Sequence, residues 1–204
     1  MAAGGAILLA RALDSPVGAG ARDPAQPAVP GAVAELGTDP GAQEALLTLF
    51  PPEPLPAEVA ALPPAEQVAR LRAMVAAGAG APVRVALGAV LQGRGDGAGA
   101  ERAYRDALRE APGDLSAQVG LAMVVGAGDP PGPGRAAARL ADLASAHPRS
   151  QVVLFNQGLL AVYRERPGEA RKTWTRTAAV GPTTRLGLLA TAALQALERL
   201  EPAP

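Results

Sequence analysis

The chain contains no cysteine and few aromatic residues, and both shortages limit what it can be. Without cysteine it forms no disulfide and has no thiolate to bind zinc or to act as a nucleophile. Aromatic residues make up only 2% of the 204 residues, although 49% are hydrophobic. Alanine and leucine must therefore form most of the core, and alanine has the highest helix propensity of all residues. These shortages favour closely packed helices.

An excess of charge of either sign is also lacking, because 19 basic residues balance 19 acidic ones. DNA binding needs several cations on one face, so we expect no nucleic-acid partner. His147 is the single histidine. A metal site would need carboxylates alone, and we expect neither a metal nor a cofactor. Nucleophilic catalysis needs a base beside a serine or threonine, and His147 has no obvious partner serine. The sequence predicts that the protein is not an enzyme, and no small-molecule substrate is evident.

The N-terminus, residues 1–37, combines a short apolar stretch with an Ala/Gly/Pro-rich segment. Residues 1–13 are too few to span a membrane, and no basic cluster precedes them. Two interpretations stay open: a frayed helix or tail, or a truncated signal-anchor. The following residues are expected to form a disordered tether. A membrane contact is expected through this N-terminus only, so the location is either cytoplasmic or envelope-associated.

Residues 38–80 are predicted to form a helical extension or a degenerate repeat, two alternatives that the sequence leaves open. Leucines and a phenylalanine cluster over Gln43–Phe50, which we expect to be helical until Pro51 stops it. A second helix is expected over Ala65–Ala77, because Val68, Leu71 and Val75 recur there at helical spacing. No alternating pattern typical of a strand follows anywhere in the chain.

From residue 81 onward the chain repeats itself. Residues 81–114 carry the positions that recur in the later copies. These positions are Leu87-Gly88, Ala100, Tyr104, Ala107 and Pro112. Residues 151–184 place Gly158, Ala170, Trp174 and Pro182 at the corresponding offsets. A middle copy, residues 115–150, has Leu121-Ala122, Ala136, Leu140 and Pro148 after an insertion of two residues. Each copy predicts one helix pair, and residues 185–204 add a final helix and tail.

These spacings resemble the tetratricopeptide repeat (TPR) family, here of a bacterial type, whose unit is a helix-turn-helix of about 34 residues. The resemblance implies an all-α fold. We expect a short right-handed TPR-like superhelix of stacked antiparallel helix pairs, closed by a C-terminal capping helix. In such a fold Gly88 and Ala100 are small because two helices touch there, whereas Tyr104 fills the space between neighbouring pairs.

The resemblance also implies a peptide-binding groove, because the first helix of each pair lines the concave side of TPR arrays. The positions carried over are Val85, Ala89, Gln92, Val119, Met123, Phe155, Asn156, Leu159 and Tyr163. Phe155 and Tyr163 are the expected anchors, since aromatic residues are favoured at binding surfaces. The alternative is that residues 41–77 or the C-terminal helix cover these side chains and make them part of the core.

The function expected from this resemblance is non-catalytic binding of a protein or peptide of unknown identity. A second hypothesis is a membrane-anchored envelope assembly factor resembling the TPR domains of cytochrome c maturation proteins. A third is a structural module that self-associates into an oligomer through its apolar C-terminal helix. TPR domains that clamp the C-terminal carboxylate of chaperones use Lys, Arg and Asn in the groove. Val85, Ala89, Gly120, Val152 and Asn156 stand at these places here, so the clamp is absent and this partner class is disfavoured.

Overall fold

The computed structural model describes residues 48–126 and 132–200, and these ranges contain helices and no strands. Two helices come first, α2 (Ala57–Ala60) and α3 (Pro64–Ala76). Three pairs follow: α4 (Ala81–Gly93) with α5 (Gly97–Glu110), α6 (Leu115–Gly126) with α7 (Gly132–Ala146), and α8 (Gln151–Tyr163) with α9 (Pro167–Val180). Helix α10 (Arg185–Leu200) is last. The predicted all-α class is confirmed for this part of the chain, whereas the tether predicted at 1–37 lies outside the described residues.

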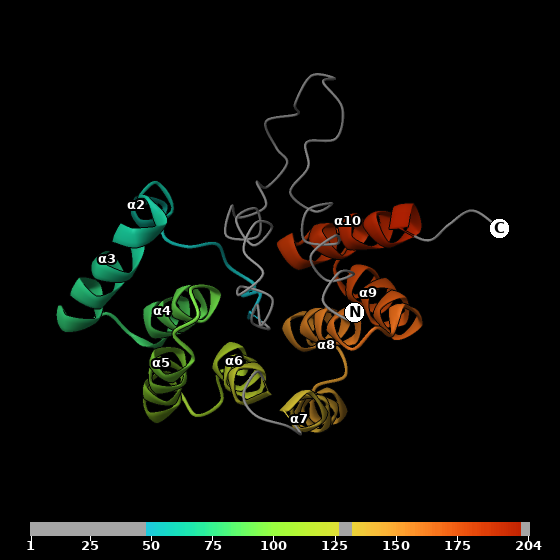
Figure 1. Ribbon diagram of the computed structural model, residues 1–204, viewed down its shortest axis with the longest axis horizontal. Coiled ribbons are helices and arrows are strands. Elements are labelled where there is room, and N and C mark those ends of the chain that lie inside the picture. The colour runs from blue at the N-terminus through green and yellow to red at the C-terminus, as the bar shows by residue number, and fades with distance from the viewer. Residues whose placement is uncertain (1–47, 127–131, 201–204) are drawn as a thin grey trace, which may run out of the picture.

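The helices follow one another around an arc, as Figure 1 shows, with α4, α6 and α8 on the inner side and α5, α7 and α9 on the outer side. Each helix from α2 to α10 packs against the next helix in the sequence. The inner helices also pack on one another, α4 on α6 and α6 on α8. This sequential packing is consistent with a helical-repeat solenoid.

Side-chain caps set the start of three of these helices. The Asp96 carboxylate accepts a hydrogen bond from the Gly99 N–H at 2.7 Å, and Asp114 accepts one from the Ala117 N–H at 2.9 Å. The Ser150 hydroxyl is placed in the same way at the start of α8. Such caps satisfy backbone N–H groups that have no partner within the helix. Local sequence therefore fixes the beginning of α5, α6 and α8.

Glycine next to a large aromatic ring sets the spacing between helices. The fully buried Tyr104 ring lies so close to α4 and α6 that a Cβ at Gly88 or Gly120 would come within 2.5 Å of its Cε1. Trp174 lies against Gly158 in the same manner in the last pair. The ring fills the volume that two glycines leave free, and burial of such a ring contributes roughly 2–3 kcal/mol.

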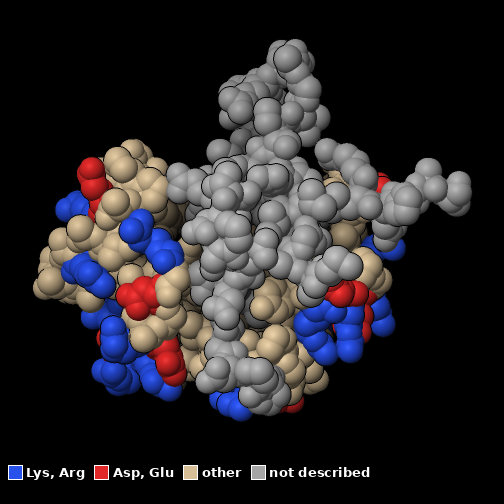
Figure 2. Space-filling model, viewed as in Figure 1, with Lys and Arg blue, Asp and Glu red and all other residues tan. Residues whose placement is uncertain are grey.

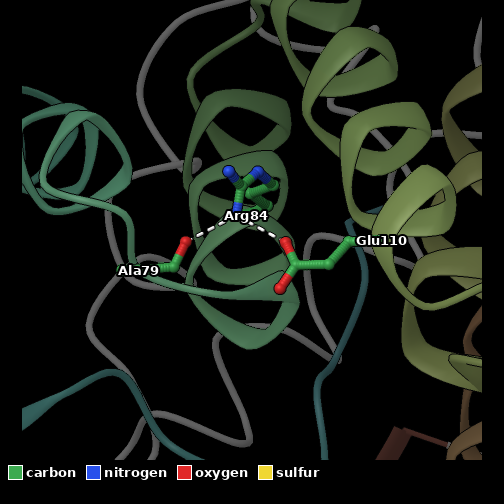
Figure 3. A network of polar contacts seen from close by, with 3 residues as sticks. All are labelled: Ala79, Arg84 and Glu110. Atoms are coloured by element: carbon green, nitrogen blue, oxygen red, sulfur yellow. Dashed lines mark hydrogen bonds and ion pairs between the residues drawn. The ribbon is translucent and has the colours of Figure 1, made fainter.

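Arg84 joins the start of the first pair to its end (Figure 3). From α4 it donates hydrogen bonds to the Ala79 carbonyl at 2.5 Å and to the Glu110 carboxylate at 2.7 Å. The connection between α3 and α4 is thereby tied to the last turn of α5.

Elsewhere on the described surface, basic and acidic side chains lie side by side at both ends of the face in Figure 2.

Two local predictions were wrong. The helix expected over Gln43–Phe50 is absent at residues 48–50, and the rest of that range lies outside the described residues. A residue before proline is disfavoured in the α conformation, and Phe50 precedes Pro51. The Gly/Pro-rich sequence of Gly126–Gly134 predicts a loop up to Gly134, but α7 already begins at Gly132. Pro133 is tolerated there, since the first turn of a helix needs no N–H donor.

Candidate functional site

The candidate site is the inner face of the array, where α4, α8 and α10 contact the segment Thr48–Glu53, called here the inner segment. In Figure 1 this segment is the cyan coil that runs from α2 to the centre of the arc. Thr48 lies beside the end of α4, where a Cβ at Gly93 would be 3.9 Å from its side chain. Leu49 is buried, with 2% of its surface exposed. The inner face is therefore covered by part of the chain itself.

Asn156 of α8 holds the backbone of the inner segment. Its Oδ1 accepts the Phe50 N–H at 2.9 Å, and its Nδ2 donates to the Phe50 carbonyl at 3.1 Å. The same Nδ2 donates to the Val152 carbonyl of α8 at 2.8 Å, which orients the amide. The N–H and C=O of one residue point to the same side only in extended backbone, as in a strand pair. Asn156 therefore contacts an extended main chain rather than a side chain.

Three aromatic rings continue from the inner segment into the core. The Phe50 and Phe155 ring centroids lie 5.3 Å apart, and those of Phe155 and Trp174 lie 5.9 Å apart. The Trp174 indole N–H donates to the Phe155 carbonyl at 3.0 Å, which fixes the outer ring against α8. Aromatic pairs at such distances contribute roughly 0.5–1.5 kcal/mol beyond their burial. The contact with Phe50 is thus connected to the single tryptophan of the chain.

Arg185, at the start of α10, is the second polar contact of the inner segment. Its guanidinium donates to the Pro51 carbonyl at 2.5 Å. Burial lowers the pKa of Arg185, and the negative charge of Glu53 acts in the opposite direction. The guanidinium stays protonated at physiological pH, since an arginine pKa starts above 12. One carboxylate of the inner segment thus stabilises the cation that holds its main chain.

The structure places the predicted groove residues in two environments. Fully or almost fully buried are Val85, Ala89, Gln92, Val119, Met123, Phe155 and Asn156. Leu159 and Tyr163 are half-buried and pack against the core. Gln92 accepts a hydrogen bond from the Tyr104 hydroxyl at 2.9 Å, across the first pair. Among the predicted residues, Phe155 and Asn156 are brought together on the inner segment.

Sequence reasoning missed the partners of Phe155 and Asn156. The sequence predicts a helix that ends at Pro51 and a last helix that begins at Arg185, and neither prediction brings these residues to the inner face. The Phe50-Pro51-Pro52 sequence carries a signal for extended backbone, because each proline restricts the residue before it. That signal predicts the conformation of the inner segment but not its location, since Phe50 and Asn156 are 106 residues apart.

Apart from the inner face, the structure has a cleft between α7, α8 and α9. This cleft has a volume of about 270 Å³, and Leu140, Gln157, Leu160, Arg164 and Glu169 are among its lining residues. Leu140 stands at the position that Tyr104 and Trp174 occupy in the other pairs. Leucine is smaller than these aromatic residues, and Leu140 lines the cleft.

Within residues 48–126 and 132–200, no three His, Asp or Glu side chains lie close enough together to hold a metal ion. In the same part of the chain, no helix combines the length and the apolar character needed to cross a bilayer. No family model, curated protein or solved structure matches the chain. The geometry of the inner face is therefore the guide to the function of this chain.

Proposed function

We propose that this protein is a TPR-like scaffold that binds extended polypeptide segments on the inner face of its helix array. The observation that carries the proposal is the pair of hydrogen bonds between the Asn156 amide and the backbone of Phe50. Because both bonds go to main-chain atoms, the same asparagine can hold any segment that presents an extended residue at this point. The function proposed is binding, without catalysis.

The helix arrangement supports the TPR-like part of the proposal. Helices α8 and α9 begin and end 70 residues after α4 and α5, so the first and last pairs have identical element lengths. Both pairs place a glycine of the inner helix against an aromatic ring of the outer one. The units of 34 to 36 residues agree with the length of a tetratricopeptide unit. Such arrays present an extended concave surface for polypeptides.

The expected affinity is modest. Burying one aromatic and one leucine side chain contributes roughly 1.5–3 kcal/mol each. The hydrogen bonds of Asn156 and Arg185 add about 1–3 kcal/mol each. Association and the ordering of an extended segment cost a large part of this sum, so a dissociation constant in the micromolar range is expected.

A peptide selection on the full chain tests the proposal. A phage-displayed library of random peptides is selected on the wild type and on Phe50→Ala, in which the inner segment is held less firmly. We expect Phe50→Ala to enrich peptides that the double variant Phe50→Ala/Asn156→Leu does not retain. Gln157→Leu in the same background is the matched control, because Gln157 lies on α8 and donates to Leu140 instead. Enrichment of no peptide by Phe50→Ala, or of the same peptides by the Asn156→Leu variant, contradicts the proposal.

A further inference from the structure

The inner segment meets the inner face through contacts that a second polypeptide could make equally well. Asn156 and Arg185 bond to main-chain atoms of Phe50 and Pro51, on two different helices. Leu49 and Phe50 supply the apolar contacts, with Leu49 2% exposed and the Phe50 ring tilted by 54° against the Phe155 ring. Each of these contacts is non-covalent, and the hydrogen bonds come from side chains of the array. A segment with the same residues can therefore exchange with the inner segment.

Proline explains why this sequence suits the inner face. Pro51 disfavours the helical conformation at Phe50 and leaves the extended one, which the two bonds of Asn156 require. Pro51 and Pro52 have no N–H, so no backbone donor of theirs is left without a partner against the apolar face. A residue before proline also loses less conformational entropy on binding, since its unbound states are already restricted. The Phe-Pro order thus pre-forms the bound conformation.

The charge of the site favours an acidic residue after the two prolines. Glu53 lies three positions after Phe50 and attracts the partly buried guanidinium of Arg185. A lysine or arginine at this place would be repelled by the same group. The inner segment therefore satisfies three requirements in order: an apolar residue, an aromatic residue and proline. The positive charge of Arg185 in addition favours an acidic residue two positions beyond that proline.

We propose that the inner face is specific for unstructured segments of other proteins with the pattern Leu-Phe-Pro-x-Glu, and that Leu49–Glu53 is a tethered copy of this ligand. The inference rests on the proposed function and names its ligand class. The chain's own copy competes with the partner for Asn156, Phe155 and Arg185. Binding is consequently weak until a partner with the same pattern is present at high concentration or in several copies.

Tethering sets the size of this competition. The inner segment is joined to α2 by Pro54, Leu55 and Pro56, and a link this short gives an effective concentration on the order of 1 mM. For an intrinsic dissociation constant of about 10 μM, the tethered copy lowers the apparent affinity of an external peptide about 100-fold. Weakening the tethered copy alone should recover a large part of that factor.

A fluorescein-labelled peptide with the sequence of residues 48–55, TLFPPEPL, is the probe. Fluorescence anisotropy is measured with the full-length wild type and with Phe50→Ala. We expect Phe50→Ala to bind the peptide 10- to 100-fold more tightly than the wild type. Adding Asn156→Leu should abolish that gain, whereas adding Gln157→Leu should leave it unchanged. Circular dichroism of each variant shows whether the helices are retained.

Variants of the peptide test the pattern itself. Replacing its phenylalanine by alanine should weaken binding to Phe50→Ala at least 10-fold, and replacing the first proline by alanine should weaken it several-fold. Replacing its glutamate by glutamine should weaken binding and reduce the dependence on salt, because the attraction to Arg185 is lost. Peptides of the same composition in scrambled order serve as controls. Equal binding of the scrambled and native peptides contradicts the proposal.

A measurement on the wild type covers the case in which Phe50→Ala does not fold. Hydrogen exchange of the Phe50 amide is followed with and without 1 mM unlabelled peptide. Release of the inner segment should accelerate this exchange at least several-fold, and an unchanged rate contradicts the proposal. Sedimentation of the wild type separates another occupant: a dimer that the peptide splits would show that a second copy of the chain is the ligand, and would overturn the inference.

The outcomes distinguish the inference from the proposed function. If the peptide TLFPPEPL fails while the random library yields other Asn156-dependent ligands, the Leu-Phe-Pro-x-Glu pattern is wrong and the binding function remains. If neither the peptide nor the library binds to the folded Phe50→Ala variant, the binding function itself is wrong.

Discussion

Glu165 adopts in the last helix pair the left-handed conformation that Gly95 adopts in the first pair. Their φ angles are 56° and 86°, and each residue lies at the same offset from the start of its pair. In both turns the N–H of the next residue returns to the carbonyl five residues earlier, Asp96 to Leu91 and Arg166 to Ala161. The turn geometry is therefore the same, although only one of the two sequences suits it.

The first prediction concerns this strained turn. Replacing Glu165 by glycine should raise the free energy of unfolding by about 0.5–1 kcal/mol, because a non-glycine residue at positive φ costs roughly 1–2 kcal/mol and glycine loses part of this gain through its entropy. Urea denaturation followed by circular dichroism measures the change. Gly95→Ala is the reciprocal variant and should lower stability. A lower stability of Glu165→Gly would show that the Glu165 side chain has a favourable role of its own.

The second prediction concerns the contact between glycine and aromatic rings. Gly88→Ala should destabilise the protein by about 2–3 kcal/mol, since the new Cβ would lie 2.5 Å from the Tyr104 ring and overpacking has this magnitude. Gly168→Ala is the matched control, because Gly168 also lies in a helix and no heavy atom is near its missing Cβ. That variant should gain up to about 1 kcal/mol from helix propensity.

The middle pair suggests a second substitution that reduces the loss of stability caused by Gly88→Ala. There Ala122 and Leu140 stand where the first pair has Gly88 and Tyr104. Adding Tyr104→Leu to Gly88→Ala should therefore cost less than the sum of the two single changes. A double-mutant cycle measured by urea denaturation gives this coupling, and additivity within 0.3–0.5 kcal/mol would contradict the direct contact.

How far the sequence predicts the fold follows from the range of each signal. The Gly88–Tyr104 spacing lies within one helix pair and recurs in the last pair as Gly158 and Trp174, so the sequence alone indicates it. The location of Phe50 is not indicated in this way, because Leu46, Leu47, Leu49 and Phe50 are also compatible with a helix stripe. The position of Phe50 on the inner face is set by its hydrogen bonds to Asn156, which is 106 residues away in the sequence. A single sequence contains no pattern that connects the two.

The third prediction concerns the hydrogen bonds of Asn156. Asn156→Leu keeps a similar volume but removes two bonds to Phe50 and one to Val152, so we expect a loss of about 1–3 kcal/mol for the backbone groups left without partners. Hydrogen exchange of the Phe50 amide should accelerate. Fluorescence of Trp174 should also change, because Phe155 joins its ring to that of Phe50.

Gln157→Leu is the control for Asn156→Leu, since it removes one hydrogen bond of the neighbouring residue on α8 without touching the inner segment. Its Phe50 amide should exchange as in the wild type. Equal acceleration in both variants would mean that the effect passes through α8 as a whole rather than through the Asn156 amide.

The fourth prediction concerns alkaline pH. Burial raises the pKa of Tyr104 far above its ordinary value of about 10. A raised pKa in the folded state means that the contribution of the neutral phenol is fully present below pH 10 and is lost as the pH rises above it. The free energy of unfolding should fall by about 1.4 kcal/mol per pH unit from pH 10 upward.

Tyr104→Phe separates this loss from other alkaline effects. At pH 7 the variant should be about 1 kcal/mol less stable than the wild type, because the hydrogen bond to Gln92 is missing. Above pH 10 it has no phenol to ionise at this position, so the two stability curves should cross near pH 11. Urea denaturation at pH 7, 9, 10 and 11.5 gives the curves, and Tyr163→Phe serves as the control for the half-buried second tyrosine. Parallel curves for Tyr104→Phe and the wild type would show that the Tyr104 phenol ionises without leaving its place between α4 and α6.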